Sequence, residues 1–351
     1  MGVGSIKISD LDDFVEECDR LGGVQSIKAE PFISDFSLQL SIYVDEALDP
    51  FSPEYTNMQI SVYKEISGRE LNQVVGEQDV RVDVEKNIKT ANPYGIKDTN
   101  FIAKHARAVL TSLLVSQLPA NAKILDMGAG WGLSTEMLAF AGAEVHAVDI
   151  NPLFVELIRN RVKPRCYDVK AFEGEFDLFK SSSLYDLILF YESLHHAIKP
   201  WETIRHLSRY LKPDGKITIA GEPINHIWWK NWGIRLDALS VYCIRKFGWF
   251  ESGWSEKFIS ECFDREGFTL TLLPFIGLDN GHVGVAIRRE NKTKISADAV
   301  MPSVLTNNFE ILQNERNQLA ARLHLIESSR IYKIANRFRN TRLVQIIRKL
   351  I

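Results

Sequence analysis

The stretch Ile124-Leu-Asp-Met-Gly-Ala-Gly-Trp-Gly132 decides the fold of this chain. A short apolar run leads into three glycines at alternate positions, and the spacing of the next residues predicts a helix over 133–141. Glycine lets the backbone approach a ligand closely at the electropositive N-terminus of such a helix. In doubly wound α/β folds, nucleotide cofactors bind at this turn between a first strand and a helix.

Short strand patterns and helix patterns alternate around this turn. We predict strands over 123–127, 144–148, 185–191 and 216–221, and helices over 98–118, 133–141, 152–161 and 201–211. Such alternation predicts a parallel sheet with helices on both faces. Two last strand patterns, 268–273 and 282–288, follow a helix over 255–266 with no helix between them. We therefore expect those two strands to be antiparallel neighbours.

The rest of the chain predicts additional parts around this domain. We expect an N-terminal accessory region over 1–95, with a helix start at Ser9-Asp-Leu-Asp12 and strand-like alternation over 38–44. The main domain covers 96–290 and contains an insertion or lid over 223–254. A linker over 291–304 leads to a C-terminal helical tail over 305–351, with a coiled-coil-like heptad pattern and a basic amphipathic end.

Composition excludes several classes of protein. A hydrophobic fraction of 45%, a charged fraction of 25% and a net charge of -3 are typical of an ordinary globular protein and disfavour a nucleic-acid partner. No apolar run reaches the roughly 20 residues that span a bilayer, and the four cysteines form no CxxC pair. We predict a cytoplasmic protein whose tail, 305–351, makes peripheral contact with the inner face of the membrane or self-associates.

Two details of the glycine turn favour a sulfonium cofactor over a dinucleotide. Leu133 stands where the dinucleotide fingerprint GxGxxG has its last glycine. Asp126 places a carboxylate near the region that a pyrophosphate would occupy, which repels a diphosphate and attracts an ammonium and a sulfonium. Asp149, at the end of the second strand, suits the ribose hydroxyls of either cofactor. Its alternative role is an N-cap for the helix that starts near Pro152.

With these motifs, residues 101–288 resemble the class I S-adenosylmethionine-dependent methyltransferases. The resemblance implies a Rossmann-like, doubly wound, seven-stranded and mostly parallel sheet in the order 3-2-1-4-5-7-6, with strand seven antiparallel. It implies that the glycine loop contacts the methionine part of S-adenosylmethionine, Asp149 the ribose, and either Glu173 or Glu175 the adenine. The cofactor-binding residues predicted in this way are Asp126, Gly128, Ala129, Gly130, Gly132, Asp149, Ile150, Glu173, Glu175 and Tyr191.

The segment Phe190-Tyr-Glu-Ser-Leu-His-His196 resembles the family's motif beside the transferring methyl group. An imidazole titrates near neutral pH, so one of its two histidines could take the proton of a hydroxyl acceptor. The alternative is that both only cap or pack the junction after the fourth strand. We predict catalytic roles for His195, His196 and Glu192, and substrate contacts for Glu222, His226 and Trp228. The spacing is not a recognised metal signature, so we predict no metal.

Five of the seven tryptophans lie in or next to the stretch Pro223 to Gly253: Trp228, Trp229, Trp232, Trp249 and Trp254. They either pack into the core or form a lid that orients an acceptor. Ahead of the glycine turn, Asn92-Pro-Tyr-Gly95 is interpreted as a turn or as a Tyr94 contact over the cofactor.

Three segments also resemble bacterial enzymes of surface polysaccharide biosynthesis: Glu327-Ser-Ser-Arg-Ile-Tyr-Lys333, Glu192-Ser-Leu-His-His196 and Gly221-Glu-Pro-Ile224. This resemblance implies a saccharide acceptor. We therefore predict an S-adenosylmethionine-dependent methyltransferase that O-methylates a small-molecule or saccharide acceptor by in-line transfer. The alternatives are an NAD-dependent oxidoreductase or epimerase, and a non-catalytic scaffold in polysaccharide assembly.

Overall fold

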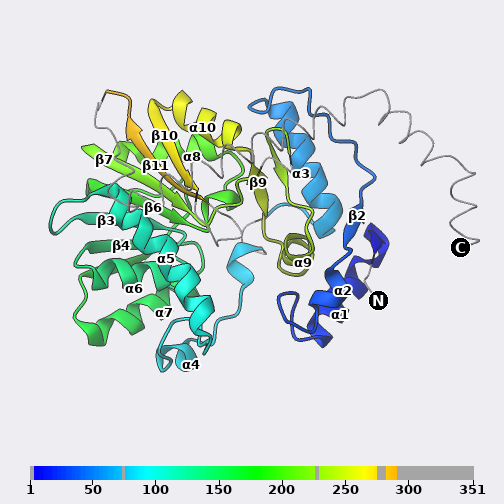
Figure 1. Cartoon of the computed structure of the whole chain (residues 1–351), viewed down its shortest axis with the longest axis horizontal. Coiled ribbons are helices and arrows are strands. Elements are labelled where there is room, and N and C mark those ends of the chain that lie inside the picture. Colours follow the sequence, from blue (N-terminus) through cyan, green and yellow to red (C-terminus); the bar gives the residue numbers. More distant parts are fainter. Residues whose placement is uncertain (1–3, 73–75, 226–228, 275–281, 291–351) are drawn as a thin grey trace, which may run out of the picture. The chain divides into compact units, whose positions relative to one another are not determined.

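A seven-stranded sheet forms the centre of the computed structural model, which describes residues 4–72, 76–225, 229–274 and 282–290 (Figure 1). Its strands are β3 (Lys123–Met127), β4 (Glu144–Asp149), β5 (Val169–Glu173), β6 (Tyr185–Tyr191), β7 (Leu211–Ala220), β10 (Phe268–Pro274) and β11 (His282–Arg288). Their order is β5-β4-β3-β6-β7-β11-β10, and β11 is antiparallel to both of its neighbours. This confirms the predicted order 3-2-1-4-5-7-6.

Helices cover both faces of this sheet. They are α5 (Thr99–Ser116), α6 (Leu133–Phe140), α7 (Pro152–Val162), α8 (Pro200–Leu207) and α10 (Glu256–Arg265). The chain moves from β3 towards one edge through α6 and α7 and towards the other edge through α8. Because parallel crossovers are right-handed, these two sets of helices lie on opposite faces. The central strand β3 is accordingly buried on both sides at Ile124, Leu125 and Met127.

Side-chain caps fix the starts of the predicted helices. The carboxylate of Asp98 accepts hydrogen bonds from the Asn100 and Phe101 amides at the start of α5. The hydroxyl of Ser255 accepts one from the Phe258 amide at the start of α10. Such caps satisfy backbone donors that have no partner within the helix. The predicted helix starts near 98 and 255 are thus confirmed.

The structure corrects the sequence interpretation in three places. The predicted strand over 38–44 is only β2 (Ser37–Gln39), which pairs in parallel with β1 (Ser5–Lys7). The strand predicted over 216–221 begins earlier, at Leu211, and β7 contains an irregularity between Leu211 and Lys216, where its register against β6 shifts. This irregularity is a bulge that absorbs extra residues without ending the strand. The helix predicted over 201–211 ends at Leu207 and continues as a short 3-10 turn.

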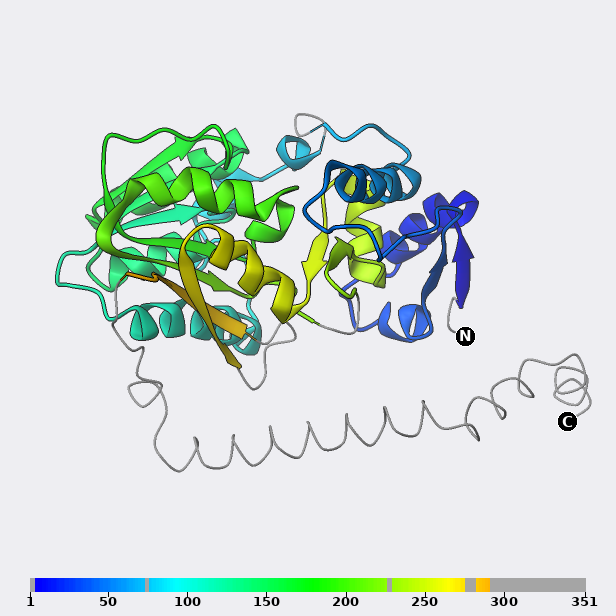
Figure 2. The same ribbon diagram turned by 90° about the horizontal axis from the view of Figure 1, so that it is seen from above.

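A second group of elements, which we call the cap, packs beside the carboxyl ends of the strands. It consists of α1 (Leu11–Arg20), α2 (Glu30–Ile33), α3 (Pro53–Ser67), β8 (Trp232–Ile234), α9 (Ala238–Phe247) and β9 (Ser252–Trp254). The N-terminal helices α1 and α3 contact α9, which comes from the predicted insertion (Figure 1, Figure 2). Between cap and sheet runs a segment with the short helix α4 (Val84–Ile88).

Specific hydrogen bonds join the two halves of the cap. The Tyr63 hydroxyl donates to the Gly248 carbonyl at 2.8 Å, and the Trp232 indole donates to the Pro50 carbonyl at 2.8 Å. Buried apolar residues of the cap belong to the same hydrophobic cluster as those of the sheet. The N-terminal region and the insertion therefore fold as one layer rather than as separate appendages.

Two of the tryptophans are core residues. Trp232 and Trp254 are fully buried and face each other across the β8–β9 pair. The ring of Trp229 lies against Gly233, where an added Cβ would come within 2.6 Å of it. For Trp232 and Trp254 the core interpretation is right, and Trp229 is partly buried against Gly233. Trp228 lies outside the described residues.

Other sequence predictions concern the termini and the cysteines. The linker over 291–304 and the tail over 305–351 lie outside the described residues, so those predictions stay predictions. All four cysteines are free thiols. Among the described helices, none is both long and apolar enough to cross a membrane.

Candidate active site

A cleft of about 1110 Å³ opens between the carboxyl ends of β3, β4 and β6 and the cap. The sheet side contributes the glycine loop, Asp149 and Glu192. The cap side contributes Tyr242, Phe247, Trp249 and the loop over 22–26. The sheet's connections run in opposite directions from β3, and the crevice at such a switch point is the usual ligand site of a doubly wound fold.

The glycines of the turn all have positive φ angles: 70° at Gly128, 50° at Gly130 and 85° at Gly132. An added Cβ at Gly128 would lie 2.5 Å from the Ser193 Cβ, and one at Gly132 would lie 2.6 Å from the Ile158 Cγ1. At Gly130 such a Cβ would meet no heavy atom within 4 Å. Gly128 and Gly132 are therefore needed for packing, whereas Gly130 leaves open space in the cleft.

Asp149 is held against the glycine loop. Its Oδ2 accepts a hydrogen bond from the Gly130 amide at 2.7 Å, and its Oδ1 accepts one from the Asn151 amide at 2.8 Å. Burial raises the pKa of this carboxyl to about 6. The side chain that caps α7 is Asn151, which accepts from the Leu153 amide at 2.9 Å. The alternative role of Asp149 as an N-cap is therefore wrong, and the residue lines the cleft.

Asp126 has another role than the one its sequence position indicated. It is fully buried, and its Oδ2 accepts hydrogen bonds from the Ser134 hydroxyl at 2.8 Å and the Thr135 hydroxyl at 2.6 Å. These bonds tie β3 to α6, and burial raises the pKa of the carboxyl to about 6. The residue does not line the cleft. Asp149, not Asp126, presents its carboxylate there, and direct cofactor contact by Asp126 stays a prediction.

Glu173 ends β5, and Glu175 follows it. Both residues and Ile150 line a hollow of about 690 Å³, but of the three only Glu175 and Ile150 also line the cleft. Of the two carboxylates offered for the adenine, Glu175 is thus the one that the fold places in the cleft. Ala129 also lines the cleft, and its amide donates to the Val148 carbonyl at 3.0 Å.

Glu192 and Tyr191 enter the cleft directly after β6. Glu192 has a φ of 49°, a left-handed conformation that is uncommon for a residue with a side chain. Gly221 makes room for it, since an added Cβ there would lie 2.5 Å from the Glu192 Cγ. The carboxylate lies inside the cleft, and desolvation raises its pKa to about 7. Strained backbone of this kind is concentrated at functional sites.

A histidine that sequence reasoning missed lies next to this pair. His105, on α5, forms a hydrogen bond through Nδ1 with the Tyr191 hydroxyl, and the same Nδ1 lies 3.6 Å from the Glu192 Oε2. Burial lowers the pKa of His105, which favours the neutral imidazole. Tyr94 packs against His105 and Trp131 and lines the cleft, and a contact of Tyr94 with the cofactor stays a prediction.

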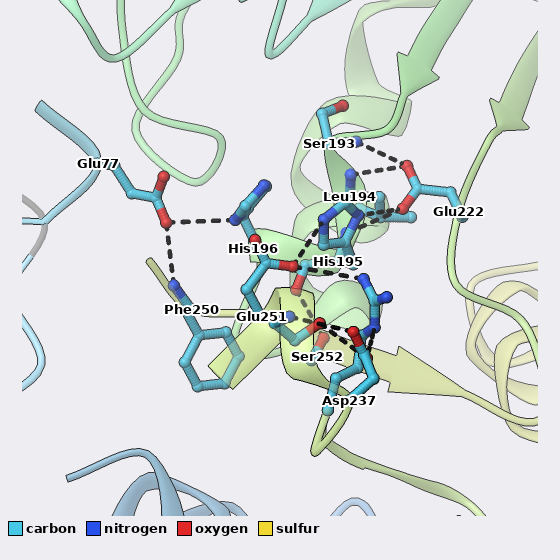
Figure 3. Close-up of polar contacts among 12 residues, drawn as sticks. Glu77, Ser193, Leu194, His195, His196, Glu222, Asp237, Phe250, Glu251 and Ser252 are labelled. Atoms are coloured by element: carbon cyan, nitrogen blue, oxygen red, sulfur yellow. Dashed lines mark hydrogen bonds and ion pairs between the residues drawn. The ribbon is translucent and has the colours of Figure 1, made fainter. Parts of the chain in front are cut away.

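His195 is enclosed by carboxylates (Figure 3). Its Nδ1 lies 2.8 Å from the Glu222 Oε2, and its Nε2 lies 3.5 Å from the Glu251 Oε2. Burial opposes the charged imidazole, but Glu222 and Glu251 outweigh it and raise the pKa of His195 to about 10. In this state both ring nitrogens carry protons at neutral pH. The prediction that His195 acts as the base is therefore not supported by its surroundings.

Glu222 is buried, and both of its carboxylate oxygens accept hydrogen bonds from the turn that precedes α8. Its Oε1 accepts hydrogen bonds from the Ser193 and Leu194 amides, both at 2.9 Å, and its Oε2 accepts one from the His195 amide at 3.1 Å. It does not line the cleft. The predicted substrate contact by Glu222 is thus replaced by a structural role, because its carboxylate neutralises the donors of this turn.

His196 faces the segment that joins cap and sheet. Its Nδ1 lies 3.2 Å from the Glu77 Oε1, and its ring lies on that of His195 with centroids 4.2 Å apart (Figure 3). Burial opposes its charge, but Glu77 raises the pKa of His196. Its ring also meets Trp249 edge-on. Trp249 lines the cleft, so for this tryptophan the interpretation as part of a binding surface stays open.

Glu77, His105, Arg235 and Glu251 were absent from the sequence prediction. Glu251 carried one usable signal, because it is an acidic residue inside the aromatic stretch Gly248 to Trp254. His226 and Trp228, both predicted to contact the substrate, lie outside the described residues.

Comparison with known families agrees with this geometry. Residues 125–217 match the model of a family described as a methyltransferase domain. This segment runs from the glycine turn to β7, so the prediction of a methyltransferase domain there is confirmed.

The chain is also similar to curated enzymes over about the same length. A ubiquinone biosynthesis O-methyltransferase of Xanthomonas axonopodis pv. citri is 32% identical over 109 residues, which are 29% of this chain and 44% of that protein. The Coxiella burnetii enzyme of the same name is 30% identical over 101 residues, 27% of this chain and 41% of that protein. The chain thus spans less than half the length of these relatives.

Solved structures show partial likenesses. The magnesium protoporphyrin IX methyltransferase of Synechocystis PCC 6803 gives a TM-score of 0.43 at 18% identity, covering 60% of this chain and 92% of that one. The N-methyltransferase NodS of Bradyrhizobium japonicum WM9 gives 0.40 at 20% identity, covering 58% and 95%.

Proposed function

We propose that this chain is an S-adenosylmethionine-dependent methyltransferase that methylates an oxygen of a small-molecule or saccharide acceptor. One observation carries the proposal. The Gly130 amide donates a hydrogen bond to the Asp149 carboxylate, and both residues line the same cleft as Glu192. Gly130, Asp149 and Glu192 lie within the segment 125–217, which matches the methyltransferase domain. The names of the curated relatives, which are O-methyltransferases, support oxygen as the acceptor atom.

The residues of the cleft fit S-adenosylmethionine. Gly130 leaves space, Asp149 has further lone pairs for ribose hydroxyls, and Glu175 is placed to accept from an adenine amino group. The carboxylates of Asp149 and Glu175 attract a cation and repel a pyrophosphate. When bound, S-adenosylmethionine supplies a methyl group on a positively charged sulfur.

Glu192 is the residue best placed to take the acceptor's proton. Its carboxylate lies in the cleft, and a pKa of about 7 leaves a large fraction of it ionised at neutral pH. An effective general base has a pKa near the working pH. His105 and the Tyr191 hydroxyl are hydrogen-bonded to each other and lie beside the Glu192 carboxylate, which they help to orient. Of the three predicted catalytic residues, His195, His196 and Glu192, we therefore propose Glu192 as the base.

The cap provides the other wall of the cleft. Tyr242, Phe247 and Trp249 present aromatic surface to the cleft, which suits the apolar faces of a sugar or another ring. Excluding water and holding the acceptor in line is the main task of a protein that promotes methyl transfer. A role in surface polysaccharide biosynthesis is supported by the sequence resemblance alone.

Calorimetric titration of the full chain with S-adenosylmethionine tests the proposal. Asp149→Ala removes a charged hydrogen-bond acceptor, so we expect affinity to fall by roughly 10- to 100-fold. Asp13→Ala, which changes an exposed residue of α1, is the matched control and should leave affinity unchanged. Equal affinity in both variants would contradict the cofactor site, and binding of NAD in its place would favour the oxidoreductase or epimerase.

Incubation with labelled S-adenosylmethionine and extracts of the source organism tests the acceptor. We expect label in a glycan or another small molecule, bound through oxygen. Tight cofactor binding without label transfer to any fraction would favour the non-catalytic scaffold.

A further inference from the structure

Three donor side chains form a compact group in the wall of the cleft. The ligand atoms of His195, His196 and Glu251 all lie within 4.8 Å of one another. The histidines come from the 3-10 turn Leu194–His196, and Glu251 comes from the residues before β9 of the cap. All three residues line the cleft. Two imidazoles and one carboxylate are a donor set that suits Zn²⁺ and neighbouring divalent transition metals.

The surroundings of His195 match those of a metal ligand. Glu222 lies 2.8 Å from its Nδ1, and this leaves Nε2 directed at the Glu251 Oε2, 3.5 Å away (Figure 3). A carboxylate that binds one ring nitrogen while the other faces the metal is the usual outer arrangement at such sites. Glu222 is itself fixed by three backbone amides, so it orients the imidazole firmly.

His196 supplies the second imidazole of the group. Its Nδ1 lies 3.2 Å from the Glu77 Oε1, so a carboxylate faces this ring as well. The two histidine rings lie against each other with centroids 4.2 Å apart, so both would reach one ion after small side-chain rotations.

The charges around the group also favour an added cation. The carboxylates of Glu77, Glu222 and Glu251 surround the two imidazoles. Arg235 contacts Glu251 at 3.5 Å and Asp237 at 3.1 Å, so Asp237 shares its positive charge. An ion with two positive charges would balance the remaining carboxylates. The positive charge of Arg235 would repel a metal ion. Its contact with Glu251 is longer than its contact with Asp237.

We propose that His195, His196 and Glu251 bind one divalent transition metal ion, which displaces the proton that the His195 Nε2 otherwise carries and releases it to solvent. One coordination position of the ion would be open to the cleft. Metal binding itself is independent of the proposed function. Because the site faces the cleft, the open position would hold an oxygen of the acceptor, and this second step rests on the proposed function.

The test uses the full chain without a histidine tag, stripped with a chelator and then titrated with Co²⁺ alone. We expect one Co²⁺ per chain and visible absorption bands typical of nitrogen and oxygen ligands. Calorimetry with Zn²⁺ should give the same stoichiometry. The metal titrations contain no cofactor. If the titrations with S-adenosylmethionine are run in the presence of a chelator, failure of metal binding and failure of cofactor binding are distinguishable.

Three variants make the result specific. Glu251→Gln and His196→Asn should abolish the bands. Glu222→Gln should weaken binding by roughly 10- to 100-fold, as is typical when the outer partner of a metal-bound histidine is lost. His206→Asn is the matched control, because His206 lies on α8 and bonds to the Phe179 carbonyl. Near-ultraviolet circular dichroism checks that each variant is folded.

Absence of Co²⁺ binding by the folded wild-type chain would overturn the proposal. So would equal affinity in folded Glu251→Gln or His196→Asn protein. In either case the group is a protonated ion-pair network that joins the cap to the turn after β6.

Discussion

Replacing Asp126 by asparagine tests whether burial raises the pKa of this carboxyl in the folded protein. Asp126 is fully buried, and its pKa is raised from 3.8 to about 6. In the unfolded chain this carboxyl ionises near its ordinary value, so between about pH 4 and pH 6 the folded state holds more protons than the unfolded state. Stability conferred by this group therefore falls as the pH rises through that window.

The size of the effect follows from the shift. A difference of about two pKa units, at about 1.4 kcal/mol each, corresponds to about 3 kcal/mol. Asparagine does not ionise, so Asp126→Asn should become more stable relative to wild type by about 3 kcal/mol between pH 4 and pH 7.5. The asparagine amide also takes the place of Oδ1, which has no partner, but that cost is the same at every pH.

Urea unfolding at several pH values, without cofactor, measures this difference. Thr135→Val serves as a second variant, because the Thr135 hydroxyl lowers the pKa of Asp126. Its loss should shift the window to higher pH. A difference between Asp126→Asn and wild type that does not change with pH would refute the reasoning, and Asp126 would then be stabilised as a carboxylate by contacts other than those described.

Two further predictions concern the rate of methyl transfer and the glycine turn. Glu192→Gln should keep cofactor affinity but lower kcat by about 10²- to 10⁴-fold. In a stopped assay with labelled S-adenosylmethionine, the wild-type rate should rise with pH through about 7, where Glu192 ionises. The residual rate of the variant should not show this rise. Gly132→Ala should destabilise the fold by about 1–3 kcal/mol in urea unfolding, because φ is 85° and the new Cβ would lie 2.6 Å from Ile158; unchanged stability would mean that the turn adopts another conformation.

Most of the central sheet could be predicted because its strands carry their signal locally. The strands β3 and β6 are apolar runs buried on both faces, and they begin and end where the sequence pattern does. The order of the strands required the family resemblance, since pairing between distant segments leaves no local pattern. The bulge in β7 was missed because Pro213-Asp-Gly215 is also a common turn sequence.

The candidate site was predictable only where it lies on the sheet. Gly130, Asp149 and Glu192 follow directly from strand ends, and the structure places all three in the cleft. Glu222 also follows a strand end, yet its carboxylate is turned to the amides of the preceding turn. Whether a side chain at a strand end faces the cleft or the core depends on neighbours that are distant in sequence.

The positions of Glu77 and Glu251 also could not be predicted from local sequence. Glu77 and Glu251 reach the two histidines from segments that precede the glycine turn by about fifty residues and follow it by more than a hundred. No periodicity within either segment encodes that meeting. It arises because α1 and α3 pack on α9 and bring the insertion to the edge of the sheet.

This arrangement divides the determinants of binding between two parts of the chain. In our proposal the sheet edge supplies the groups that bind the cofactor, and the aromatic residues of the cap that line the cleft bind the acceptor. His195 joins the two, because its carbonyl accepts from the Ser252 hydroxyl at 2.6 Å while its ring lies between Glu222 of the sheet and Glu251 of the cap. A substitution in the cap that alters the choice of acceptor should therefore leave cofactor affinity unchanged, unless it removes a contact between His195 and the cap. Substitutions of Glu251 are expected to affect both.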